Sequence, residues 1–257
     1  AIVGMAVSWG VKRGIYSNEA GQGTGPHASS AASVSHPVKQ GLVQAFSVYV
    51  DTLLVCSATA FMILITGSYN VVGPDNANLF IGLKDVATGP AYTQAAVEGL
   101  MPGFGQAFIA IALFFFAFTT VLSYYYIAET NVCYINRKLK SPFLFVILKV
   151  FVMSSCIFGA VKTADLAWAV GDIGVGLMAW LNIIAIILMH KKAFLCLKDY
   201  EKQLAIGLDP VFHPEKLRIR GADYWTGGRA EEIRDKERAK LSSGSRTDLE
   251  GGNILNV

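Results

Sequence analysis

Near its start, an otherwise apolar chain carries the sequence Gly14-Ile15-Tyr16-Ser17-Asn18-Glu19-Ala20-Gly21-Gln22-Gly23-Thr24-Gly25-Pro26. Lipid leaves no backbone polar group unpaired at low cost, so a spanning segment interrupted by Gly and Pro belongs where backbone lines a cavity inside protein. In secondary transporters, such interruptions hold the substrate and the coupling ion. The stretch therefore predicts a broken membrane helix beside a binding cavity.

The composition is that of a membrane protein. The 257 residues are 53% hydrophobic and only 16% charged, whereas soluble domains carry about 25% charged residues. The net charge of +3 is small, and we expect no nucleic-acid partner. The four cysteines have no metal-ligand spacing and are interpreted as free thiols.

Apolar runs of spanning length predict an all-α multi-pass membrane protein, since a spanning helix needs roughly 20 apolar residues. The transmembrane region is expected over residues 1–192, followed by a polar tail over 193–257. A long polar loop is expected over 67–103. The expected spans are a broken helix over about 1–34 and continuous helices over about 41–66, 104–130, 142–161 and 164–189.

The charges predict the orientation. A basic loop at 137–140 (RKLK) lies on the same side as the tail, whereas the loop 67–103 carries more acidic than basic residues. By the positive-inside rule the tail is cytoplasmic and the long loop is outside. Lys12 and Arg13 then lie on the outer side of the broken helix, against the rule. The expected location is a plasma membrane or a bacterial inner membrane.

The chain begins with Ala-Ile-Val-Gly-Met, in the middle of an apolar pattern and without a signal-peptide pattern. We expect it to be a piece of a longer protein.

The broken segment offers ligands for an ion and for a zwitterion. Unwinding a helix exposes carbonyls at one half-helix end and N–H groups at the other, which suit a cation and a carboxylate respectively. Ser17, Asn18 and Glu19 can add side-chain oxygens. The alternative is a plain loop between two interfacial helices. A nucleotide-binding loop at residues 21–25 is disfavoured, because no predicted strand precedes the glycines.

Hydroxyl groups gather on the helix expected at 104–130. Thr120 and Tyr124 are four residues apart and share a face, with Ser123 beside them. One interpretation makes Thr119 and Thr120 cation ligands and Tyr124 a wall of the substrate pocket. The alternative is that the threonine hydroxyls bond the carbonyls of their own helix.

Two aspartates lie inside expected spans, Asp51 and Asp172. Ionisable residues at such positions are rare and are functional by default. Either could instead serve only as a hydrogen-bond partner for a neighbouring helix.

Several segments resemble the sodium/alanine (or glycine) symporter family of the amino acid–polyamine–cation superfamily. The most specific are residues 12–23 (KRGIYSNEAGQG) and 35–41 (SHPVKQG). Weaker similarities follow at 50–56 (VDTLLVC), 117–120 (AFTT), 171–173 (GDI), 198–200 (KDY) and 207–212 (GLDPVF). The resemblance extends from residue 1 to about residue 215.

The resemblance implies two inverted five-helix repeats of the leucine-transporter type, of which this chain would be the second repeat with its tail. It implies that Tyr16, Ser17, Asn18, Glu19, Ala20 and Gly21 contact the amino acid, together with Thr120 and Tyr124. It also implies that Thr119 and Thr120 ligate sodium. The chain departs from the family pattern at Tyr16, where Phe is usual, and at Ser123-Tyr124, where Gly-Trp is usual.

The implied function is sodium-coupled symport of a small neutral amino acid, alanine or glycine, by alternating access. The first repeat, on the same or a separate polypeptide, would supply the other half of both sites. No cofactor other than the coupling sodium ion is expected. An enzyme is not expected, since the sequence shows neither a nucleophile–base pair nor a metal-ligand cluster. The alternative is a transport-inactive membrane sensor or assembly subunit with the same fold.

Overall fold

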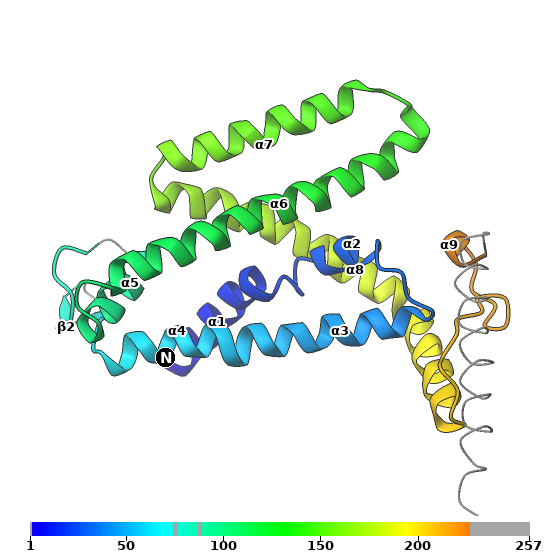
Figure 1. Ribbon diagram of the computed structural model, residues 1–257, viewed down its shortest axis with the longest axis horizontal. Coiled ribbons are helices and arrows are strands. Elements are labelled where there is room, and N and C mark those ends of the chain that lie inside the picture. Colours follow the sequence, from blue (N-terminus) through cyan, green and yellow to red (C-terminus); the bar gives the residue numbers. More distant parts are fainter. Residues whose placement is uncertain (1, 74–76, 87–88, 227–257) are drawn as a thin grey trace, which may run out of the picture. The chain divides into compact units, whose positions relative to one another are not determined.

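The protein is described here by a computed structural model that covers residues 2–73, 77–86 and 89–226 (Figure 1). Its elements are α1 (Ile2–Asn18), α2 (Thr24–Ser29), α3 (Pro37–Tyr49), the π-helix η1 (Val50–Cys56), α4 (Ser57–Ile65), β1 (Asn70–Val72), β2 (Asn78–Ile81), α5 (Pro90–Leu100), α6 (Gly105–Leu139), α7 (Phe143–Val161), α8 (Ala164–Ala205) and α9 (Asp223–Thr226).

Four helical segments of the described chain are long and apolar enough to span a membrane: Pro37–Ile65, Gly105–Leu139, Phe143–Val161 and Leu166–Ala205. Their large apolar side chains are mostly exposed, as on helices whose solvent is lipid. The mostly helical structure agrees with the expected multi-pass membrane protein. The broken segment is also present, since α1 ends at Asn18 and α2 begins at Thr24.

Helix ends depart from the expected boundaries because hydropathy does not decide where a helix stops. The helix expected to end near residue 130 continues as α6 to Leu139, where Lys140 takes a left-handed conformation with φ 48°. The helix expected to end near 189 continues as α8 to Ala205 and stops before Gly207, with φ 76°. Residues 190–205 carry more charge than the preceding turns of α8, but most of them are good helix formers.

The segment 67–103, expected to be a polar loop, contains regular structure. Strands β1 and β2 pair antiparallel, with Asn70 opposite Ile81, and α5 follows. The Asn70 side chain accepts from Leu83 N at 2.9 Å and donates to the Leu83 carbonyl at 2.8 Å. The Glu98 carboxylate then accepts from the N–H groups of Gly103 (2.6 Å) and Gln106 (2.9 Å) at the start of α6. These backbone donors hold the pKa of Glu98 below its usual value.

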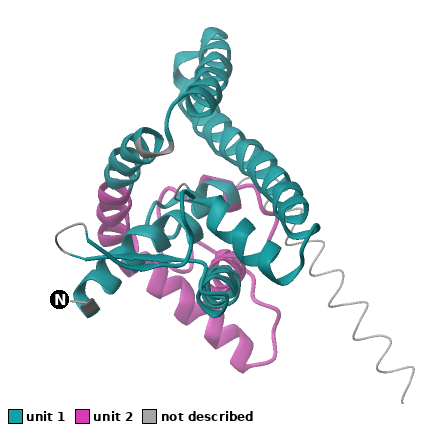
Figure 2. Ribbon diagram, turned by 90° about the vertical axis from the view of Figure 1, so that its left-hand side faces the viewer, with its two compact units in different colours: residues 1–28, 47–178 teal, residues 29–46, 179–257 magenta. Residues whose placement is uncertain are grey.

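The chain divides into two compact units, which Figure 2 shows in different colours. Unit 1 comprises residues 1–28 and 47–178, and unit 2 comprises residues 29–46 and 179–257. Unit 1 contains every residue that the sequence singled out for a site. Unit 2 contains the start of α3, the second half of α8 and the C-terminal segment.

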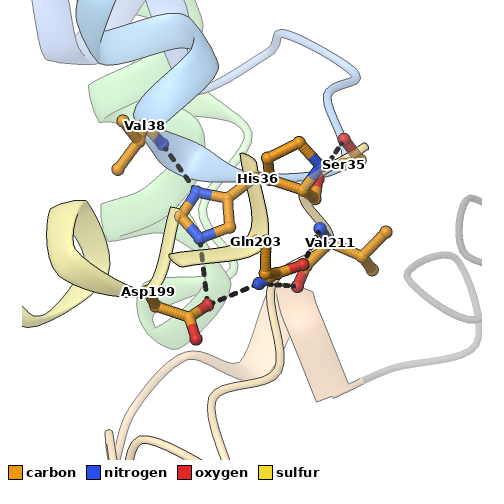
Figure 3. A network of polar contacts seen from close by, with 7 residues as sticks. Ser35, His36, Val38, Asp199, Gln203 and Val211 are labelled. Atoms are coloured by element: carbon orange, nitrogen blue, oxygen red, sulfur yellow. Dashed lines mark hydrogen bonds and ion pairs between the residues drawn. The ribbon is translucent and has the colours of Figure 1, made fainter. Parts of the chain in front are cut away.

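Unit 2 is organised around His36, which is fully buried (Figure 3). Its Nδ1 accepts from the N–H of Val38 at 3.2 Å, so the proton of the neutral ring sits on Nε2, 3.4 Å from Asp199 Oδ2. The rings of Tyr200 and Phe212 pack against it at 5.2 and 5.4 Å.

The C-terminal segment is tied to the same place. Phe212 N donates to the Ser35 carbonyl, and Ser35 Oγ donates to the Pro210 carbonyl, both at 2.9 Å. Gln203 bridges Asp199 to Val211 by accepting from Val211 N and donating to both the Asp199 carboxylate and the Val211 carbonyl. Residues 209–214 therefore fold back onto α8, in a part of the chain where a solvated tail was expected. The expected tail beyond residue 226 lies outside the described residues.

Burial lowers the pKa of His36, although the neighbouring Asp199 carboxylate opposes this effect. A lowered pKa means that the unfolded state binds the proton more tightly, so stability is full above the ordinary His pKa of about 6.5 and is lost as the pH falls below it. We expect amide-exchange protection at Val211 and Phe212, corrected for intrinsic rates, to drop severalfold between about pH 7.5 and 5.5. The His36→Gln variant should lose this pH-dependent drop in protection, whereas the control variant His190→Gln, altered at an exposed site, should keep it. An unchanged drop in His36→Gln would contradict the assignment of the effect to His36.

Candidate functional site

The break in the first helix is held by its own side chains. Glu19 takes a left-handed conformation, with φ 58°, and its carbonyl accepts from the N–H groups of Gln22 and Gly23 at 3.1 Å. The Asn18 side chain accepts from Ala20 N at 3.1 Å, and Gln22 Nε2 donates to the Ile15 carbonyl at 2.9 Å. Side chains thus satisfy backbone groups that the missing helical turn would have paired.

Gly21 allows the chain to turn back over the last turn of α1. A Cβ at this position would lie 2.8 Å from Ile15 Cγ1, well inside van der Waals contact. The glycine therefore has a packing role at the break, besides the backbone exposure that the sequence suggested.

The end of α1 is attached to the π-helix. Ser17 Oγ donates to Asp51, at 2.7 and 2.9 Å from its two carboxylate oxygens, and lies 3.2 Å from Cys56 Sγ. Asn18 Nδ2 donates to Thr52 Oγ1 at 3.2 Å. In a π-helix residues i and i+5 lie one above the other, so Asp51 and Cys56 both face Ser17. Asp51 is thus a hydrogen-bond partner of Ser17 at the end of α1.

Asp172 lies in a second polar cluster on the broken helix. Tyr16 donates its hydroxyl proton to Asp172 Oδ1 at 2.7 Å, and Lys12 Nζ lies 2.5 Å from Oδ2. Arg13 is 3.6 Å from the same carboxylate and stacks its guanidinium 4.5 Å from the centre of the Trp168 ring. The Tyr16 ring meets Trp168 edge-on at 5.3 Å. The cluster gives Lys12 and Arg13 a compensating anion.

Tyr124 of α6 reaches the break. Its phenol interacts with the Glu19 carboxylate and with the Gln22 side chain, and Glu19 also accepts from Thr24 Oγ1. The structure thus brings Tyr124 together with Glu19, one of the residues that the sequence singled out at the break.

The two threonines of α6 that were predicted to ligate sodium take little part in the contacts at the break. Thr119 Oγ1 donates to carbonyls of its own helix, those of Phe115 at 2.9 Å and Phe116 at 3.1 Å. Within the described residues, neither Thr119 nor Thr120 hydrogen-bonds to the break, and no group of three or more His, Cys, Asp or Glu could hold a metal. The Thr119 hydroxyl thus donates its hydrogen bond within its own helix. The lone pairs of its oxygen can still accept a cation.

Sequence reasoning missed several participants, among them Trp168, Gln22 and Thr24. Trp168 had a usable signal, because it precedes Asp172 by four residues and so shares a helix face with it. Gln22 and Thr24 had none, since their partners depend on how the chain turns after Glu19.

Comparison with known proteins identifies the family. Residues 1–214 match the sodium:alanine symporter family. The chain belongs to this family. Among its relatives, it is 62% identical over 224 residues to the putative sodium/proton-dependent alanine carrier protein YrbD of Bacillus subtilis, covering 87% of this chain and 46% of the relative. It is 58% identical over 228 residues to the sodium/proton-dependent alanine carrier protein of Bacillus sp. PS3, covering 88% and 51%.

A more distant family member is the sodium/alanine symporter AgcS of Methanococcus maripaludis, 37% identical over 189 residues, covering 74% of this chain and 38% of the relative. The chain thus spans about half the length of the curated relatives that it matches. No solved structure matches the chain.

The Asp172 cluster generates a stability prediction for this member of the family. Asp172→Asn should lower the melting temperature by a few degrees, because it leaves Lys12 and Arg13 close together without their anion. Adding Lys12→Met should recover part of the loss, which a double-mutant cycle by thermal unfolding in detergent would measure.

The control for this cycle is Asp85→Asn, which alters an exposed aspartate between β2 and α5 and should not couple to Lys12→Met. Strictly additive effects of Asp172→Asn and Lys12→Met would show that the pair contributes nothing.

Proposed function

We propose that this chain is the C-terminal half of a sodium-coupled symporter for a small neutral amino acid, alanine or glycine, which works by alternating access. The observation that carries the proposal is the broken helix at residues 19–23, held by η1 and α8 and adjoined by Tyr124, in a chain of the sodium:alanine symporter family. The names of the two Bacillus relatives described above, both alanine carriers, support the substrate class.

The proposed architecture is the second five-helix repeat of an inverted-repeat fold. An interrupted helical segment followed by four helices of spanning length supports it. The missing first repeat, with its own broken helix, would supply the opposite wall of the pocket. The tail would be cytoplasmic and the protein would lie in the cell membrane.

In this proposal Tyr16 borders the substrate with its ring while its hydroxyl stays bonded to Asp172. Residues 17–21 present backbone and short side chains to the amino acid, which suits a substrate with a small side chain. Tyr124 closes the same pocket from α6. Asp51 acts as a positioning residue, because it fixes Ser17 at the edge of the break.

Thr119 and Thr120 would ligate sodium through oxygens, which hard cations prefer. The remaining ligands would come from the missing repeat. Sodium that binds better to the outward-open form would shift the population toward it and so raise substrate affinity. The sodium gradient then drives uptake without covalent chemistry.

The test of the proposed function is uptake of labelled alanine and glycine by the full-length protein in proteoliposomes, with and without an inward sodium gradient. We expect accumulation above equilibrium only with the gradient. Binding without accumulation under any ion gradient would contradict the proposal and favour a sensor.

Removing a sodium ligand should weaken the sodium dependence of uptake. We expect Thr120→Val to raise the half-saturating sodium concentration about tenfold, which corresponds to losing about 1.4 kcal/mol of binding. Thr130→Val is the matched control, because the Thr130 hydroxyl bonds the carbonyl of Tyr126 in the same helix. Equal sodium dependence in both variants would remove Thr120 from the ion site.

The Tyr16 ring and its hydroxyl should have separable roles. Tyr16→Phe keeps the ring and should leave the apparent substrate constant within about twofold, whereas Tyr16→Ala should raise it about tenfold, by loss of apolar contact worth about 1.4 kcal/mol. The measurement is initial uptake at saturating sodium, normalised to the protein in the membrane. A Tyr16→Ala variant with unchanged substrate constant would exclude Tyr16 from the pocket.

A further inference from the structure

Unit 2 contains a cavity of about 510 Å³ that the transport site does not use. It is bounded by the start of α3, the second half of α8 and the C-terminal segment around 219–225. Its wall is mainly apolar, and the residues that form it include Val38, Gly41, Met189, Ala193, Phe212 and Trp225.

Two cations line the same cavity, Lys192 and Arg220. Both side chains are exposed, and neither has an ion-pair partner among the described residues. Asp223 is the acidic residue of the lining, so the balance is positive. An apolar wall with an uncompensated cationic edge is complementary to a molecule that has an anionic head and an apolar tail.

The position of the cavity along its helices fits a membrane boundary. Pro37 is the first residue of one candidate span, and in α8 the apolar sequence ending at Met189 gives way to His190-Lys191-Lys192. Tyr224 and Trp225 also line the cavity, and such aromatic residues are enriched where membrane meets water. Basic pockets beside spanning helices at a cytoplasmic surface are a known way of binding anionic lipid head groups.

We propose that this cavity binds an anionic glycerophospholipid. Its phosphate would pair with Lys192 and Arg220, and an acyl chain would lie along the wall formed by Gly41, Ala193 and Trp225. The assignment to the cytoplasmic leaflet rests on the orientation given under the proposed function, whereas binding itself does not. The bound lipid would join the start of α3 to the C-terminal segment, beside the hydrogen bonds that Ser35 makes with Pro210 and Phe212.

The test is native mass spectrometry of the detergent-purified protein with phosphatidylglycerol or phosphatidylcholine of the same acyl composition. We expect the wild type to retain phosphatidylglycerol in preference to phosphatidylcholine. Each cation near an anionic lipid head contributes roughly a fivefold effect, so the variant with both Lys192→Gln and Arg220→Gln should bind phosphatidylglycerol roughly 25-fold more weakly. Lys191→Gln, which neutralises a neighbour outside the lining, should change little.

A second variant tests the apolar wall with both cations in place. A Cβ at Gly41 would meet no atom within 4 Å, so Gly41→Leu should fold and occupy the cavity, and it should lose phosphatidylglycerol at least as fully as the charge variant. Undiminished phosphatidylglycerol binding in either variant would overturn the proposal. Equal competition by glycerol 3-phosphate, which has no acyl chain, would also overturn it in favour of a soluble phosphate site. Lipid binding is measured without transport, so its failure is distinguishable from failure of the proposed symport.

Discussion

The arrangement of unit 1 depends on the need to pair every backbone polar group where helix α1 is interrupted. Five residues, 19–23, separate α1 from α2, and unpaired groups there would each cost several kcal/mol, or about 2–7 on transfer scales. Glu19, Asn18 and Gln22 pair these groups locally. The rest of the unit is built around this segment, because the flanking side chains of α1 are then available for contacts with other helices.

Those contacts explain why two carboxylates are stable in apolar helices. Each of the two aspartates accepts a hydrogen bond from a hydroxyl of α1. Asp51 accepts from Ser17, and Asp172 accepts from the preceding residue, Tyr16. Asp172 additionally neutralises Lys12. Two different helices therefore hold one short helix end from two directions. A position fixed in this way is suited to recognising a small ligand, because small substrates offer few contacts of their own with which to order a pocket.

The sequence was sufficient to predict the spanning helices and the break, since both follow from local composition: apolar runs, four glycines and a proline. It did not predict the pairing of β1 with β2, because strands of three and four residues leave too short a pattern to recognise. Nor did it predict the contacts of His36, since Asp199 and Phe212 are more than 160 residues away in the sequence. At the candidate site, residue types drew attention to Tyr16, Asp51 and Asp172, which the structure brings into contacts between helices. Partners across helices, such as Trp168 for Arg13, could not be derived from spacing within one helix.

The π-helix at Val50–Cys56 has a consequence for the helix that follows it. In a regular α-helix, residues five apart point about 140° away from each other, so Asp51 and Cys56 could not both face Ser17. The wider turn brings them into line and at the same time rotates everything after it by about one residue, or 100°. The face that α4 presents to its surroundings is thus set by the same local winding that seats Asp51. Deleting one residue from this turn would therefore rotate α4 about its own axis. The composition of α4 would stay intact, but the side chains that meet lipid would exchange places with those that meet protein.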